Sequence, residues 1–140
     1  MKKGYAVKIT TGGDILIVPI SRENEATFVK EIQREVGGHF EIVPASLPIE
    51  DDIAIHVDEE ALYKMKPINY VASLLYSYGH IVGDALLMPI EVDPESEYGE
   101  HDSMPMTEDR ARLVAEGCRL TVKAKLKKLY GKKEDDHDES

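Results

Sequence analysis

The segment from Phe28 to Pro44 constrains the fold more than any other part of the chain. In its first half, apolar residues recur at helical spacing and charged residues cover the rest, which predicts an amphipathic helix packed on a sheet. The apolar stripe comprises Phe28, Val29, Ile32 and Val36. Gly37 can adopt the left-handed conformation that ends a helix, and Gly38 allows the chain to turn at once into a strand at 39–43. A helix and a strand are therefore expected with no linker between them.

Two strands are expected before this helix. Tyr5–Thr10 alternates apolar and polar residues, residues 11–14 have turn chemistry, and Ile15–Ile20 is almost continuously apolar. This order predicts a β-hairpin. Because a strand covered on both faces loses the alternating pattern, we expect the second strand to be central in its sheet. Ser21 or Asn24 is expected to cap the helix that follows.

Three more elements are expected in the middle of the chain. Ile53–Asp58 alternates, which predicts a half-buried strand with one apolar and one solvated face. Apolar residues at helical spacing between Asn69, an expected N-cap, and Gly79, an expected stop, predict a second helix with Tyr78 on its buried stripe. Residues 81–88 predict a further strand that is interrupted by a Gly-Asp pair.

The last segment allows two interpretations. Residues 107–109 are typical of a helix start. Beyond Gly117 the apolar spacing fits a helix, but the stretch 120–127 also alternates as a strand would. Alanine and lysine are good helix formers and poor strand formers, so we favour a helix.

Together these elements predict an α+β fold, with a mixed sheet of about five strands and two to three helices packed chiefly on one face. A chain of 140 residues suits one domain, which we expect to span residues 1–130, with a disordered charged tail at 131–140. No apolar run is long enough to cross a membrane and the first residues do not resemble a signal peptide, so we expect a cytoplasmic protein. Cys118 has no second cysteine to pair with and is expected to be a buried, inert thiol.

The net charge of -10 is unevenly distributed along the chain. Residues 1–109 carry a charge of -13, residues 110–133 carry +8, and residues 134–140 carry -5. An acidic body repels phosphate backbones, so direct nucleic-acid binding is not expected. The basic segment is expected to fold against the body and to neutralise part of its acidic surface. The arginines expected to do so are Arg110, Arg112 and Arg119.

The sequence contains no established catalytic motif. The Gly-Gly pair follows a helix and precedes a strand, which is the wrong order for a loop that cradles phosphate. No nucleophile motif and no Cys-His pairing is present. We therefore expect a protein that is not an enzyme and needs no cofactor.

The residues around the acidic turn also include possible metal ligands. His56 and Asp58 lie two residues apart on one expected strand face and adjoin Glu59 and Glu60, and this combination could hold a divalent metal. Strong metal motifs have more ligands at fixed spacing, so a solvated strand face followed by an acidic turn is the favoured interpretation. No metal site is predicted.

Tyrosines cluster around the second expected helix, and tyrosine is favoured at binding surfaces because it combines apolar area with a polar tip. The acidic turn lies close to them in the sequence. The residues expected to form a binding surface are Asp58, Glu59, Glu60, Tyr63, Asn69, Tyr70 and Tyr76.

The order of several short motifs resembles a family of small domains of unknown function that is encoded mostly by bacteriophages, plasmids and other mobile elements. The motifs are Val18-Pro19, Val36-Gly37-Gly38, Phe40-Glu41-Ile42-Val43, Asp58-Glu59-Glu60, Pro67-x-Asn69 and Ile81-Val82-Gly83-Asp84. The likeness covers roughly Ile15 to Val114. The resemblance implies a mobile-element setting, and host-cell cytoplasm if the gene belongs to a phage, but no reaction.

Three functions are compatible with these observations. The first is a non-catalytic module that binds a host protein, such as a defence component, through the second helix and the acidic turn. The second is an oligomer that sequesters a nucleotide-like small molecule between subunits, using tyrosines, Asn69 and the Arg and Lys residues of the last segment. The third is a DNA mimic, whose carboxylates at 50–52, 58–60 and 91–109 imitate phosphates.

Overall fold

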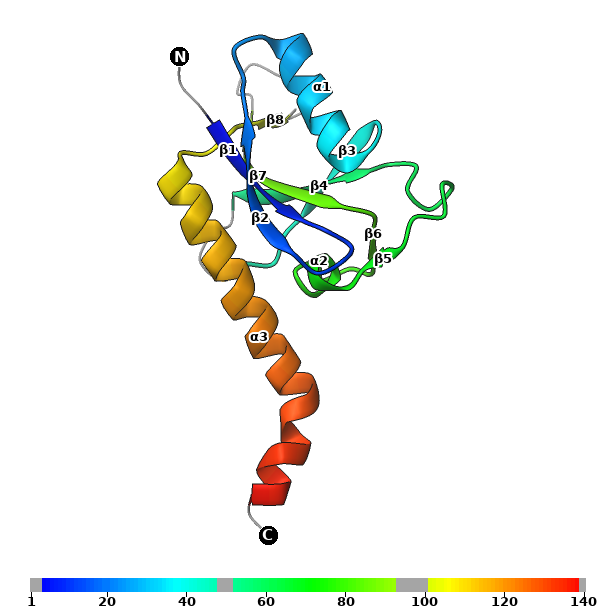
Figure 1. Cartoon of the computed structure of the whole chain (residues 1–140), viewed down its shortest axis with the longest axis vertical. Helices are drawn as coiled ribbons and strands as arrows, with labels where there is room; N and C mark the ends of the chain where they lie inside the picture. The colour runs from blue at the N-terminus through cyan, green and yellow to red at the C-terminus, as the bar shows by residue number, and fades with distance from the viewer. Residues whose placement is uncertain (1–3, 48–51, 93–100, 139–140) are drawn as a thin grey trace.

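A computed structural model describes residues 4–47, 52–92 and 101–138 of the chain. One antiparallel sheet forms its centre, in the order β2-β1-β7-β4-β3, and β8 pairs with the far end of β7 (Figure 1). The strands are β1 (Gly4–Ile9), β2 (Ile15–Ile20), β3 (Phe40–Pro44), β4 (Ile53–Asp58), β7 (Ala85–Val92) and β8 (His101–Ser103). A second, two-stranded sheet pairs β5 (Ile68–Asn69) with β6 (Ile81–Val82). The helices are α1 (Glu25–Val36), α2 (Tyr70–Leu74) and α3 (Glu108–Asp138).

The predicted α+β class is confirmed, and so is the sheet of about five strands. The sheet differs from the prediction in one respect, because every strand pairing is antiparallel and none is parallel among the described residues. Hairpins make up much of the sheet: β1 pairs with β2 from Gly4↔Ile20 to Ile9↔Ile15, as the turn chemistry predicted.

Helix α1 begins and ends where its local signals predicted. The side chain of Asn24 accepts hydrogen bonds from the backbone N–H groups of Ala26 and Thr27, which makes Asn24 and not Ser21 the N-cap. Gly37 ends the helix with a φ of 89°, in the left-handed region. These signals are local, so they could be found without knowledge of the rest of the fold.

The helices cover both faces of the sheet and not chiefly one. Neighbouring strand residues point to opposite faces, and the core divides accordingly into two clusters. The α1-side cluster comprises Ala6, Ile20, Phe28, Ile32, Val36, Leu86 and Met88. The α3-side cluster includes Val7, Ile9, Ile53, Ile55, Val57, Ala72, Leu75, Leu87, Ala111, Val114, Ala115 and Cys118. Burial raises the pKa of the Cys118 thiol to about 12, which fits the predicted inert thiol.

The prediction that β2 is a central strand is wrong, and the helices on both faces of the sheet explain why. This strand is apolar on both faces, as expected for a central strand, yet it lies at the edge of the sheet. Val18 and Ile20 pack on the α1 side, while Ile15 and Ile17 pack on the α3 side. Apolar cover from two helices, and not a second neighbouring strand, accounts for its composition.

Helix α2 is shorter than predicted. Asn69 caps it as expected, but the helix ends at Leu74 and the chain then turns. The expected helical spacing therefore fails beyond Leu75, and Tyr78 is 75% exposed where the prediction placed it in the core. Tyr76 instead packs, partly buried, against the α3-side cluster.

Helix α3 resolves the ambiguity after Gly117 in favour of a helix, and its bounds extend to Asp138. Figure 1 shows that it crosses the sheet and then continues away from the body. Arg110 reaches an acid of the body as predicted, because its Nη2 lies 2.9 Å from both carboxylate oxygens of Asp52. Arg112 and Arg119 pair instead with acids of α3 itself, Glu108 at 2.9 Å and Glu116 at 3.4 Å. The domain boundary at residue 130 stays a prediction.

The prediction that one face of β4 is solvated is wrong, because all six residues of this strand are buried. His56 therefore lies inside the protein. A carbonyl oxygen can only accept, so Nδ1 of His56 donates to the Leu86 oxygen at 3.1 Å, and Nε2 accepts from Ser103 Oγ at 2.5 Å. Burial lowers the pKa of His56 to about 4, against the opposing effect of its backbone hydrogen bonds, so the ring is neutral at pH 7.

We expect acid to destabilise the fold through His56. The unfolded chain takes up a proton near pH 6.5, whereas the folded ring does so only near pH 4. The free energy of unfolding should therefore fall by about 3 kcal/mol as the pH drops through this window, and the histidine contribution should be constant above it.

Urea denaturation at a series of pH values measures this dependence. His56→Gln keeps a neutral amide at the site and serves as the control, since its free energy of unfolding should vary much less between pH 6.5 and 4. An equal slope in both proteins would show that His56 is not responsible.

Candidate functional site

A buried carboxylate at the end of β4 organises the surface near the predicted acidic turn. The side chain of Asp58 is 0% exposed. Its Oδ2 lies 2.8 Å from Lys64 Nζ and 2.7 Å from Lys66 Nζ, and its Oδ1 accepts the backbone N–H of Glu60 at 2.9 Å. Both oxygens are thus used within the chain. Asp58 therefore holds the loop 59–66 in place and is not part of the loop's exposed surface.

The same two lysines bind the C-terminal end of α1. Lys66 Nζ donates to the carbonyl oxygen of Val36 at 3.1 Å, and Lys64 Nζ donates to that of Gly37 at 3.0 Å. The last carbonyls of a helix carry partial negative charge and favour cations. The loop after β4 is therefore fixed to both the strand and the helix.

This arrangement explains the Gly-Gly pair. Gly37 has the left-handed conformation, which side chains rarely adopt. At Gly38 a Cβ atom would lie 2.8 Å from Asp58 Oδ1, closer than such atoms come in real proteins. The two glycines let the lysines and the aspartate approach the backbone at the end of α1.

The electrostatics of Asp58 follow from these contacts. Burial alone would raise its pKa, but the hydrogen bonds from Lys64 and Lys66, with that from Glu60, outweigh it and hold the pKa at about 2. The carboxylate is therefore charged at any physiological pH. An always-charged group paired with two cations fits a structural role better than proton transfer.

The loop 59–66 exposes three large apolar side chains. Leu62 is 78% exposed, Tyr63 is 91% exposed and Met65 is 88% exposed. Backbone hydrogen bonds within the loop, such as Lys66 N to Ala61 O at 3.1 Å, close it into a compact turn in which Met65 takes a φ of 53°. Figure 1 shows the segment between β4 and β5 projecting from the body on the side away from α3. Exposed apolar side chains on a fixed loop are typical of a binding surface.

A groove lies beside this loop. Its volume is about 350 Å³, and its lining is largely apolar, with three acidic residues and His80. Leu62 and Tyr76 contribute to its wall, and Glu41 and Glu59 contribute carboxylates. The groove thus combines apolar area with negative charge, next to the exposed side chains of the loop.

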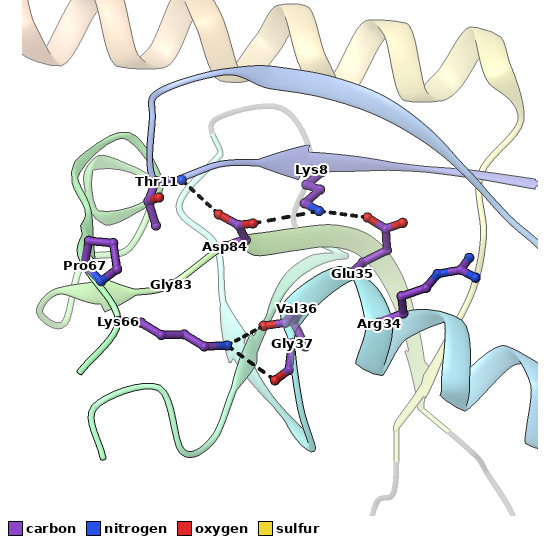
Figure 2. Close-up of a pocket in the computed structure, with 10 residues that line it drawn as sticks. All are labelled: Lys8, Thr11, Arg34, Glu35, Val36, Gly37, Lys66, Pro67, Gly83 and Asp84. Carbon is purple, nitrogen blue, oxygen red and sulfur yellow. Dashed lines mark hydrogen bonds and ion pairs between the residues drawn. The ribbon is translucent and has the colours of Figure 1, made fainter. Parts of the chain in front are cut away.

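A second cavity, of about 270 Å³, lies between α1, the β1–β2 turn and the β6–β7 turn (Figure 2). Lys8 lies 3.0 Å from Glu35 and 3.8 Å from Asp84, and Lys66 is directed at the carbonyl groups of α1. The two lysines are therefore already paired with acceptors of the chain. A negatively charged ligand would have to compete with these acceptors for the two lysines, and Arg34 is the third basic residue of the lining.

The structure brings some predicted site residues together and separates others. Glu59, Glu60 and Tyr63 lie together on the exposed loop, and Tyr76 lines the adjacent groove. Tyr70 is 70% exposed at the start of α2 and lies outside both cavities.

Asn69 occupies a different environment, because it is fully buried. Its Nδ2 donates to the carbonyl oxygens of Ile9 at 2.8 Å and Gly83 at 3.0 Å, and its Oδ1 accepts the N–H of Ala72 at 3.0 Å. These bonds join β1, the small sheet and α2. They leave no free polar atom for a ligand, so in this conformation Asn69 supports the fold.

Sequence reasoning missed Leu62 and Met65, and it missed the two lysines that fix the loop. The segment 61–66 has no clear apolar period. Large apolar residues outside any periodic pattern do not belong to the buried face of a helix or strand. The lack of a pattern in this segment could therefore have indicated that these side chains are exposed.

The same geometry bears on metal binding. The portions of the chain that the structure describes contain no group of three or more His, Cys, Asp or Glu side chains that could hold a metal ion. Both nitrogens of His56 and both oxygens of Asp58 have partners within the chain. In the same described portions, no helix has the length and apolar character needed to cross a membrane.

Comparison with known proteins identifies the family. The model of a domain of unknown function, DUF3846, matches residues 5–108, so the chain belongs to that family. No curated protein and no solved structure matches the chain. The matched region contains the sheet, α1, α2 and the loop 59–66, whereas nearly all of α3 lies beyond it.

We expect the loop to depend on the Asp58 carboxylate. Asp58→Asn keeps an oxygen for the Glu60 N–H but removes the charge that attracts Lys64 and Lys66. The free energy of unfolding should fall by about 2 kcal/mol, since removing one member of a buried ion pair is costly while the lysines can still reach water. Urea denaturation at pH 7 measures the change.

Glu59→Gln is the matched control, because it also neutralises an acid of this turn but at an exposed position. Its effect should stay within about 0.5 kcal/mol. Equal stability of the two variants would contradict the assigned role of Asp58.

Proposed function

We propose that this chain is a non-enzymatic binding protein of a phage or mobile element, which binds a host protein through the loop 59–66 and the groove beside it. The observation that carries the proposal is the exposure of Leu62, Tyr63 and Met65, each 78% or more, on a loop that is fixed to the core at both ends. A loop that is already ordered loses little conformational entropy on binding, so its apolar side chains can contribute most of their burial to affinity.

The charges around the loop indicate the chemistry of the partner. Glu59 and Glu60 are exposed, and Glu41 and Glu59 line the groove. Two basic side chains of the loop, Lys64 and Lys66, are bound to Asp58 and to the end of α1. A protein with an apolar pocket and a basic rim fits this surface, because complementary charge favours encounter and orientation.

A host defence factor is the partner that we propose within this class. The support for that step is the motif resemblance to domains encoded by mobile elements. The proposal assigns a binding and blocking role, with no reaction of its own.

The test compares capture of host proteins by three forms of the tagged protein. The loop variant Leu62→Ser, Tyr63→Ser, Met65→Ser should keep its melting temperature, because all three side chains are exposed. It should lose the protein captured by the wild type, with at least a tenfold weaker dissociation constant once that partner is purified. The control Leu129→Ser, Tyr130→Ser removes side chains of similar exposure from α3 and should retain the partner.

The salt dependence of the partner affinity then distinguishes the proposed interface from a DNA mimic. An apolar interface with a charged rim should lose little affinity as salt is raised, whereas a mimic should lose affinity steeply. Asp58 and Asp52, two of the acids assigned to the mimic, are already paired with basic side chains. Unchanged capture by the loop variant, or a steep salt dependence, would contradict the proposed binding mode.

A further inference from the structure

Strand β3 lies at one edge of the sheet and has an outer margin with which no described strand pairs. It pairs with β4 on one side only. Glu41, Ile42 and Pro44 are exposed, although they lie on both faces of the strand. A free strand edge presents unpaired backbone N–H and C=O groups, and another extended segment is the structure that can pair with them in a regular way.

The register determines which backbone groups of β3 point outward. In an antiparallel pair, successive residues alternate between facing the neighbouring strand and facing away from it. The carbonyl oxygen of His39 accepts the N–H of Glu59 at 2.9 Å, so every second residue from His39 faces β4. The residues between them, Phe40, Ile42 and Pro44, face outward. Because proline has no N–H, the free edge offers N–H groups at Phe40 and Ile42 and a carbonyl oxygen at all three.

The groove beside the loop 59–66 adjoins this edge. Side chains alternate between the two faces of a sheet, so a segment paired with β3 directs every second side chain to the groove face. On that face it meets Glu41 and Val43, which both line the groove. The side chain between them lies on the α1 side, next to Ile42, which is 36% exposed. Backbone pairing together with a pocket for alternate side chains is how strand addition recognises an extended peptide.

The charges of the groove favour a basic segment. Glu41 and Glu59 are exposed acids of its lining, and the third acid, Asp58, is already bound by two lysines of the loop. Among the described residues the lining contains His80 but no lysine or arginine. A lysine or arginine opposite Glu41 can lay its methylene groups on the apolar wall and bring its charge to the free carboxylates.

We propose that the β3 edge binds an extended segment of the partner protein, paired antiparallel as in the rest of the sheet, with a lysine or arginine of that segment in the groove. The inference rests on the proposed function, because it gives the binding mode of the groove assigned there. A second copy of this chain is the alternative occupant. Its β3 has one charged side chain, Glu41, and would bring another acid to the edge in place of a cation.

Proline substitution tests the edge without any ligand. Ile42→Pro removes an outward N–H and leaves the bonds between β3 and β4 intact, and proline is tolerated on edge strands at such positions. Its melting temperature should stay close to that of Ile42→Ala, the matched control that loses the same side chain and keeps the N–H. Val43→Pro removes an inward N–H and should melt at a clearly lower temperature. Equal destabilisation by the two prolines would overturn the assigned edge.

The binding probe is the peptide acetyl-Arg-Val-Arg-Val-Arg-amide, titrated into the ¹⁵N-labelled full chain. Chemical-shift changes should be confined to β3 and the groove lining. Ile42→Pro should weaken binding about tenfold, because a backbone hydrogen bond is lost, and Ile42→Ala should bind much as the wild type does. N-methylation of the valines, whose N–H groups face β3, should abolish binding, whereas N-methylation of the central arginine should not. The acidic peptide acetyl-Glu-Val-Glu-Val-Glu-amide should not bind.

Several results would overturn the inference. They are a basic peptide that does not bind, binding that Ile42→Pro or valine methylation leaves unchanged, and equal binding of the acidic peptide. A wild type that forms dimers in sedimentation equilibrium, with a monomeric Ile42→Pro variant, would place a second copy on the edge and would also overturn it. Capture of the host protein separates the two proposals. Loss by the loop variant with retention by Ile42→Pro contradicts this inference alone, whereas retention by the loop variant contradicts the proposed function.

Discussion

The buried carboxylate of Asp58 is the interaction on which the arrangement of this protein's exposed loop depends. It ends the interior strand β4, and it joins that strand to Lys64 and Lys66, which in turn bind the last carbonyl groups of α1. A buried charge without partners is strongly unfavourable, so the loop cannot move away without leaving this carboxylate exposed or unpaired. The position of the loop 59–66 is therefore a consequence of the core.

The two faces of the sheet differ in the residues and elements that cover them. The α1 side contains His56 and Asp58, two polar residues that are satisfied entirely within the chain. The other side holds the larger apolar cluster and α2, and it receives the first half of α3. In our proposal, the loop 59–66 is the part of the surface that binds a host protein.

The sequence predicted those parts of the fold that depend on neighbouring residues. Asn24, Gly37 and the β1–β2 turn act locally, and each was found in the expected place. The edge position of β2 and the burial of His56 depend on which elements pack from a distance, so periodicity alone could not reveal them. Short motifs in the sequence drew attention to polar residues such as Asn69. The sequence alone cannot distinguish a polar side chain that contacts a ligand from one that is hydrogen-bonded inside the protein, as Asn69 is. Of the surface that we propose for binding, the sequence indicated the acidic turn and Tyr63, and missed Leu62 and Met65.

The central claim is that the loop is held in place before any partner binds. Backbone ¹⁵N relaxation of the free protein measures this directly for residues 59–66. Order parameters near 0.85, the value of rigid backbone, are expected throughout the loop, and Asp58→Asn should lower them. Order parameters below 0.6 in the wild-type loop would contradict the account, because the carboxylate and its two lysines would then not fix the surface that we propose as the binding site.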